Sequence, residues 1–88
     1  MKLNKEYILR QIAGMWALLP TGQTARTFNG FIKINAVGAF VWQGLEKGKT
    51  AEDLIQHLAD TYGITTERAS ADVGTFIEQL RANGCIKD

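Results

Sequence analysis

A strand-like segment that runs into a helix through a single residue constrains this fold more than any other feature. Phe31–Ile34 alternates as a β-strand does, whereas Val37, Phe40 and Val41 recur at helical spacing. Asn35, between them, is a good N-cap because its side-chain oxygen can accept a free backbone N–H of the first helical turn. Because a one-residue connection allows almost no change in the orientation of the two elements, strand and helix must pack at a fixed angle. A rigid strand beside a helix can hold an extended peptide.

The residues before this junction predict two further strands. Tyr7–Ala13 and Met15–Leu19 are short runs rich in β-forming apolar residues. Thr21–Thr24 is predicted to be a polar loop. The third strand is expected within Arg26–Ile34, with a bend at Asn29-Gly30. The three strands follow one another closely enough to form an antiparallel meander.

Three helices are predicted after the junction, at about residues 36–46, 51–62 and 66–83. Thr50 and Asp53 have the spacing of a capping box at the start of the second. With a meander at about residues 7–34, the fold class is α+β: a three-stranded antiparallel sheet followed by a three-helix bundle. The chain has 88 residues, so residues 1–88 are expected to form one domain.

The last two helices show apolar stripes that predict their buried faces. The stripe of the second helix consists of Leu54, Ile55, Leu58, Ala59 and Tyr62. That of the third consists of Ala69, Val73, Phe76, Ile77 and Leu80. Gly74 interrupts the third helix, where glycine costs about 1 kcal/mol relative to alanine. It indicates either tight helix packing or a place where another backbone comes close.

Composition excludes several classes of protein. Hydrophobic residues make up 45% and charged residues 22% of the chain, a balance typical of globular domains. No apolar run approaches the roughly 18 residues of a membrane span. The N-terminus lacks the apolar run and cleavage site of a secretory signal, so a cytoplasmic location without membrane attachment is expected.

The sequence offers no catalytic or metal-binding constellation. A metal site requires several ligands at suitable spacing, and one histidine (His57) with one cysteine (Cys85) does not supply them. His57 is predicted to lie on the surface, and Cys85 to fill a small apolar space. No glycine-rich phosphate-binding loop follows a strand. The chain is therefore predicted not to be an enzyme and to need no cofactor.

Charge is distributed unevenly along the chain. Residues 1–50 hold seven Lys and Arg against two acids, whereas residues 51–88 hold three against seven. A DNA-recognition helix usually carries several basic residues, but none lies between Ala51 and Tyr62. Nucleic acid is therefore not the expected partner, although a winged-helix DNA-binding protein stays an alternative. A salt-sensitive gel shift on duplex DNA would support it.

A set of positions follows a recognisable order and spacing along the chain: Ile34-Asn35, Gly38, Val41-Trp42, Gly48, Thr50, Leu58, Tyr62, Asp72-Val73, Phe76, Leu80 and Gly84. In this order of motifs the chain resembles the PqqD family, the small proteins named for pyrroloquinoline quinone biosynthesis. The resemblance covers about residues 5–87, and the Phe28-Asn29-Gly30 insertion departs from the quinone-pathway members.

The resemblance implies a domain similar to a winged helix-turn-helix that performs no chemistry. Family members bind the leader of a ribosomally made precursor peptide and deliver it to a modifying enzyme, often a radical S-adenosylmethionine enzyme. The leader adds to the third strand and lies against the third helix. In this chain the expected contacts are Thr27, Phe28, Gly30, Phe31, Ile32, Lys33, Ala69, Asp72, Val73 and Phe76.

Alternation along the third strand predicts which of its side chains face the helices. Ile32 and Ile34 share one face and are expected to cover the helices, which leaves Phe31 and Lys33 on the other. Lys33 can also guard the open edge against self-pairing. A further alternative is a structural adaptor or dimerisation module whose edge strand pairs with its own copy. The expected state is a monomer or a weak homodimer, which sedimentation at several concentrations would test.

Overall fold

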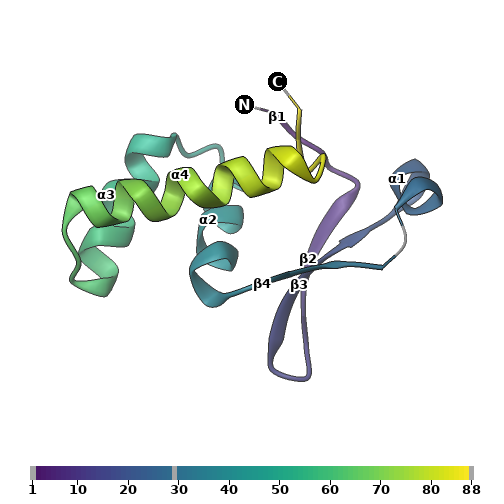
Figure 1. Ribbon diagram of the computed structural model, residues 1–88, viewed down its shortest axis with the longest axis horizontal. Coiled ribbons are helices and arrows are strands. Elements are labelled where there is room, and N and C mark those ends of the chain that lie inside the picture. The colour runs from purple at the N-terminus through teal and green to yellow at the C-terminus, as the bar shows by residue number, and fades with distance from the viewer. Residues whose placement is uncertain (1, 29, 88) are drawn as a thin grey trace.

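The structure is a computed structural model that describes residues 2–28 and 30–87. In chain order its elements are β1 (Lys2–Leu3), β2 (Tyr7–Ile12), β3 (Met15–Pro20), α1 (Gly22–Thr27), β4 (Ile32–Ile34), α2 (Ala36–Glu46), α3 (Ala51–Tyr62), α4 (Thr66–Ala82) and β5 (Ile86–Lys87). A three-stranded antiparallel sheet has the order β2-β3-β4, and β1 pairs with β5. The predicted α+β class is confirmed, and the β2–β3 hairpin projects away from the helices (Figure 1).

The β2–β3 hairpin sets the hydrogen-bonding pattern of the sheet. Its two turn residues, Ala13 and Gly14, have φ values of 51° and 79°, as a type I′ turn requires. Such a turn closes on a hydrogen-bonded pair, here Ile12 with Met15. Hydrogen-bonded and non-hydrogen-bonded pairs then alternate along the antiparallel ladder. The direction of every backbone group in β2, β3 and β4 follows from this pattern.

The main helices lie where their caps predict. α2 and α3 have the predicted bounds, and α4 ends at Ala82, one residue earlier than expected. Asn35 Oδ1 accepts a hydrogen bond from the Gly38 N–H at 2.8 Å. Thr50 and Asp53 form the predicted capping box. These caps are local, which is why sequence alone located them.

The predicted polar loop at Thr21–Thr24 is wrong, because helix α1 covers most of it. The local N-cap, Thr21, makes no side-chain hydrogen bond to the first turn of α1, because its hydroxyl donates to the Glu6 carbonyl at 2.6 Å. The Glu6 carboxylate supplies the cap instead. The Glu6 carboxylate accepts from Thr24 Oγ1 at 2.6 Å, Thr24 N–H at 2.8 Å and Gln23 N–H at 3.1 Å. These hydrogen bonds lower the pKa of Glu6, so the cap is lost as pH falls through that lowered value.

The third strand is shorter than the range in which it was expected. β4 contains three residues, Ile32–Ile34, and the segment up to Thr27 belongs to α1. The expected bend at Asn29-Gly30 falls partly on Asn29, which lies outside the described residues. A short edge strand offers few backbone groups to a partner.

The core lies between the sheet and the helices. Its largest fully buried side chains are Trp42, Leu18, Leu54, Leu58, Leu80, Val41, Val73 and Cys85. The predicted burial of Tyr62 is wrong, since this side chain is 47% exposed at the end of α3. Its ring instead meets Phe40 edge-on, with the centroids 6.3 Å apart. Within the described ranges, no helix is both long and apolar enough to cross a membrane.

The two chain ends are tied together by contacts that sequence did not predict. β1 pairs with β5, and the buried Asn4 follows β1 directly. The Asn4 amide donates to Thr24 Oγ1 and to the Gly84 carbonyl, both at 3.2 Å, and its Oδ1 accepts from the Glu6 N–H at 3.1 Å. The Asn4 N–H donates to the Cys85 carbonyl at 2.7 Å. One side chain thus joins the N-terminus, α1 and the C-terminus.

Replacing Asn4 with alanine is expected to lower the free energy of unfolding by about 1–3 kcal/mol, because the part-buried hydrogen bonds of this buried side chain are lost. Urea denaturation followed by circular dichroism measures the change. Gln11→Ala, at an exposed strand position, is the control and should stay within about 0.5 kcal/mol of the parent. Equal stabilities of the two variants would contradict the role of Asn4.

Candidate functional site

Strand β4 presents a free backbone edge centred on one residue. β4 is an outer strand of its sheet, and its Ile34 and Ile32 lie opposite Trp16 and Leu18 of β3. Counted from the hairpin turn, these are hydrogen-bonded pairs, because Trp16 and Leu18 do not bond to β2. The N–H and C=O of Lys33 therefore point away from the sheet. They are available to an added strand.

Side-chain exposure along β4 agrees with the predicted alternation. Ile34 is buried and Ile32 is half-buried, so both face the helices. Lys33 is exposed, and Phe31 is 50% exposed just before the strand. The assignment of Ile32 and Ile34 to the inner face is confirmed. Phe31 is thus an apolar side chain accessible to a partner beside the free edge.

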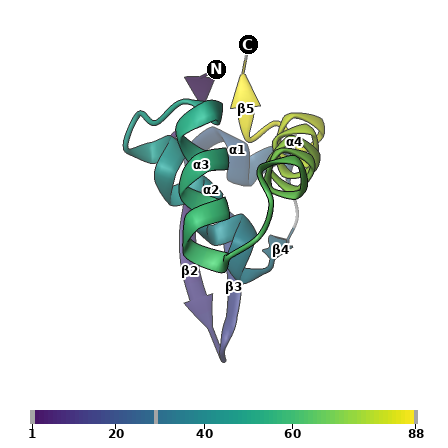
Figure 2. The same cartoon turned by 90° about the vertical axis from the view of Figure 1, so that its left-hand side faces the viewer.

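A groove accompanies this edge along α4. It consists of two hollows that share Phe76 and Gln79 as a common wall. The first hollow, of about 260 Å³, is lined by Ile32, Lys33, Ile34, Phe76, Gln79, Leu80 and Asn83. The second, of about 390 Å³, is lined by Asn35, Val37, Gly38, Arg68, Asp72, Thr75, Phe76 and Gln79. We call the pair the β4–α4 groove; β4 and α4 lie on the same side of the molecule, away from β2 (Figure 2).

The margin of α4 that lines this groove differs from the expected one. Ala69 and Val73, expected to line it, are 0% and 1% exposed, and neither lines a hollow. Both face the core because they lie on the centre of the apolar stripe. Phe76 and Asp72 do line the groove. The α4 positions that line the groove but were not among the expected contacts are Arg68, Thr75, Gln79 and Leu80, and Asn83 joins them just after the helix.

The expected contacts Thr27, Phe28 and Gly30 do not line the groove. Thr27 ends α1, and its Oγ1 donates to the Thr24 carbonyl at 3.3 Å. The Phe28 ring meets Tyr7 edge-on, with the centroids 6.0 Å apart. Gly30 is exposed and has a φ of 101°. Their contact with a peptide stays a prediction.

Gly38 determines the shape of the groove floor. A Cβ at this position would lie 2.5 Å from Cε1 of Phe76 and 2.8 Å from its Cζ. The missing side chain therefore lets the Phe76 ring lie directly against the first turn of α2. A glycine so near a helix start is a weak signal in sequence, and nothing local shows that its partner is Phe76.

Gly74, by contrast, lies on an open face. Nothing comes within 4 Å of a Cβ built there, so tight packing is not the reason for this glycine. Gly74→Ala is expected to raise the free energy of unfolding by about 0.5–1 kcal/mol, because alanine has the higher helix propensity. Thermal and urea denaturation measure the change. A lower stability would show that the site is sterically restricted.

His57 and Cys85, the two residues considered for catalysis or metal binding, lie on different elements: His57 on α3, and Cys85 between α4 and β5. His57 is exposed on α3, its ring edge-on to Phe40 at a centroid distance of 4.9 Å. Cys85 is 0% exposed, and burial raises the pKa of its thiol to about 11. Within residues 2–28 and 30–87, no group of three or more His, Cys, Asp or Glu is placed to hold a metal ion.

Iodoacetamide at pH 8 is therefore expected to leave Cys85 unmodified in the folded protein and to alkylate it in urea, because the thiolate is the reactive form. Mass spectrometry after equal reaction times measures the difference. The raised pKa also favours folding below pH 9, and this contribution is lost as pH rises from about 9 to about 11. Rapid alkylation without denaturant would contradict the burial of the thiol.

Comparisons with known proteins agree with this architecture. Residues 6–86 match the family described as coenzyme PQQ synthesis protein D (PqqD). No curated protein matches the chain. A solved structure described as "TbiB1 in Complex with the TbiA(beta) Leader Peptide" has the same fold, with a TM-score of 0.78 and 21% sequence identity over 100% of both chains. The family match spans nearly the whole chain, which therefore belongs to the PqqD family.

Proposed function

We propose that this protein binds the leader of a ribosomally synthesised precursor peptide as an added strand on β4. The observation that carries the proposal is the free N–H and C=O of Lys33 beside the β4–α4 groove. Backbone pairing fixes the register of an extended peptide, and a groove beside the edge receives alternate side chains. The TbiB1 structure, whose fold is the same, was solved with a leader peptide.

The groove provides most of the binding free energy and the selectivity in this proposal, because β4 is too short to provide them by backbone pairing alone. A disordered leader loses conformational entropy on ordering, a cost of about 2–5 kcal/mol. Lys33 alone can offset little of this, since a backbone hydrogen bond contributes about 0.5–1.5 kcal/mol net. An apolar leader side chain in contact with Phe76 and the half-buried Ile32 adds the hydrophobic contribution. The Lys33, Arg68 and Asp72 side chains around the hollows then discriminate among charged leaders.

The protein itself performs no chemistry in this proposal. It holds the leader and presents the following part of the precursor to a modifying enzyme. Resemblance to the PqqD family favours a radical S-adenosylmethionine enzyme as that partner. The buried thiol of Cys85 and the surface position of His57 agree with a binding role.

An NMR titration with a synthetic leader tests the proposal. The probes are the N-terminal segments of candidate precursor peptides, chosen as short reading frames found near this gene, and the TbiA(beta) leader serves for comparison. Backbone amide shifts are expected at residues 31–35 of the edge and residues 72–83 of α4. Shifts confined to α3 or to β2 would overturn the assignment of the groove.

Self-pairing of β4 is disfavoured by its central residue. Two copies pairing antiparallel about Lys33 would place two ammonium groups directly opposite each other, which is destabilising. A monomer is therefore expected in sedimentation experiments. A Lys33→Thr variant that dimerises would show that the charge is what keeps the edge open.

A further inference from the structure

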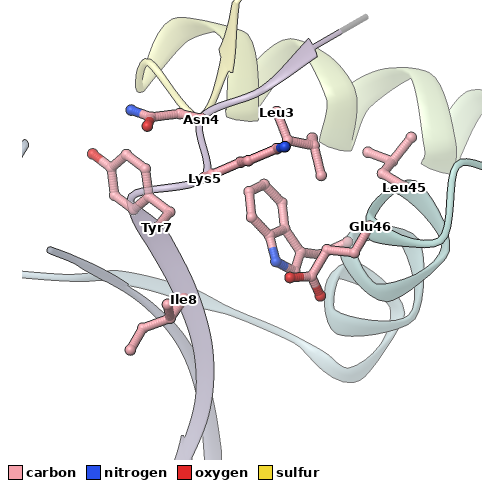
Figure 3. A pocket seen from close by; sticks show the side chains of 8 residues that line it. Leu3, Asn4, Lys5, Tyr7, Ile8, Leu45 and Glu46 are labelled. Carbon is pink, nitrogen blue, oxygen red and sulfur yellow. The ribbon is translucent and has the colours of Figure 1, made fainter.

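A second pocket lies on another part of the surface, between the β1–β2 connection and the end of α2. It has a volume of about 370 Å³ and shares no lining residue with the β4–α4 groove. Its lining consists of Leu3, Asn4, Lys5, Tyr7, Ile8, Trp42, Leu45 and Glu46 (Figure 3). We call it the Trp42 pocket. Its volume falls in the range of small-ligand sites.

Trp42, which lines this pocket, carries an unsatisfied hydrogen-bond donor. Trp42 is 1% exposed, and its indole Nε1 has no hydrogen-bond partner. Buried donors are almost always paired, because an unpaired N–H loses its water without compensation. The other buried polar side chains of the lining are already engaged: the Tyr7 hydroxyl donates to the Asn83 carbonyl at 3.3 Å, and the Asn4 amide bonds as described above. The indole N–H is therefore left for an incoming acceptor.

Two exposed side chains of opposite charge complete the pocket. Lys5 comes from the β1–β2 connection and Glu46 from the last turn of α2 (Figure 3). Neither takes part in an ion pair within residues 2–28 and 30–87. Nε1 is enclosed, so an acceptor reaches it only when neighbouring side chains move; Lys5 and Glu46 are the long, exposed ones on this rim.

This set of groups suits a primary carboxamide. The amide oxygen can accept from the Trp42 Nε1–H and from Lys5, while the amide NH₂ can donate to the Glu46 carboxylate. A carboxylate ligand would satisfy the donors but would be repelled by Glu46, and an aliphatic ligand would leave the indole unpaired. Leu3 and Leu45 provide apolar surface for the methylene groups that precede the amide. Glutamine has two such groups.

The adjoining edge of β2 indicates that the glutamine belongs to an extended chain. β2 is the other outer strand of the sheet. By the same alternation, Leu9 and Gln11 direct their backbone groups outward. The Leu9 carbonyl accepts a hydrogen bond from the Arg10 guanidinium at 2.8 Å, which an added strand would replace. We infer that the Trp42 pocket is a second protein-binding site, which takes a glutamine side chain of a partner protein whose extended segment lies along β2. The inference does not depend on leader binding.

An NMR titration with three matched peptides tests this site. The probes are acetyl-Thr-Val-X-Val-Thr-methylamides in which X is glutamine, glutamate or norleucine, and the methylamide end removes a competing primary amide. The chain has two tryptophans, so the indole N–H signal of Trp42 can be followed with Trp16 as an internal reference. The glutamine peptide is expected to shift the Trp42 signal and leave Trp16 unchanged. The other two peptides are expected to bind more weakly.

Two variants separate binding from folding. Trp42→Phe keeps an aromatic ring and removes the donor, at the cost of a smaller side chain in the core. It is expected to weaken binding of the glutamine peptide by roughly three- to tenfold. Glu46→Ala, at an exposed position, should weaken binding similarly if Trp42→Phe does not fold. Gln43→Ala, also exposed on α2 and absent from the pocket, is the matched control.

Three results would overturn the inference. The first is no Trp42 shift with any peptide. The second is butyramide binding as tightly as the glutamine peptide, which would indicate a small-molecule site. The third is a Trp42 shift that follows protein concentration alone, which would indicate a second copy of the chain. Leader binding at β4 is measured by the amide shifts of residues 31–35 and 72–83. Either binding hypothesis can therefore be contradicted without the other.

Discussion

Replacing Lys33 with proline is expected to weaken leader binding at least tenfold while the protein stays folded. The Lys33 N–H points outward from β4, so its loss removes no hydrogen bond within the sheet. The added strand loses a backbone donor and meets the proline ring at the pairing edge. Isothermal titration calorimetry with the leader measures the affinity, and circular dichroism measures the fold.

Two matched variants give this experiment its controls. Lys33→Ala keeps the backbone N–H and removes only the side chain, so its affinity should stay within about threefold of the parent. Ile32→Pro removes an N–H that bonds to Leu18 of β3, so this variant should lose stability as well as binding. Equal affinities of Lys33→Pro and the parent would exclude strand addition at β4.

Gly38→Ala is expected to lower the free energy of unfolding by about 1–3 kcal/mol and to weaken leader binding together with it. The added methyl group would overlap the Phe76 ring, which must then move. Phe76 lines both hollows of the β4–α4 groove, so its displacement changes the surface that receives the leader. Urea denaturation and calorimetric titration measure the two effects separately.

Gly44→Ala is the control for this result. A Cβ at Gly44 would meet the Leu54 side chain in the core, away from the groove. This variant should therefore lose stability and keep its affinity for the leader at a temperature where it is folded. The same loss of affinity in both variants would mean that binding follows general stability rather than the position of Phe76.

The sequence alone predicted the helices whose starts are set by hydrogen bonds between residues close together in the chain. Asn35, Thr50 and Thr65 each cap a helix through a residue three positions later, and such spacing is readable in sequence. Helix α1 has no such signal, because the carboxylate that caps it comes from Glu6. The β1–β5 pair joins the two ends of the chain, a contact that no local pattern reveals.

The candidate site was predictable in place but not in detail. Alternation correctly predicted the inward Ile32 and Ile34 and the outward Lys33. An apolar stripe on a helix shows which face is buried, but not where burial ends, so Ala69 and Val73 were assigned to the groove although both lie in the core. Gln79, which lines both hollows, is polar and lies outside the stripe.

The antiparallel pairing of Lys2 with Lys87 places the first and the last strand of the chain side by side. In Figure 1 both ends leave the molecule there, whereas β4 runs across the opposite part of it. A domain with adjacent ends can be spliced into a surface loop of a larger host without distortion. Such an insertion would leave β4, the strand proposed to bind the leader, facing outward from the host protein. It offers a way to move leader recognition from one biosynthetic protein to another.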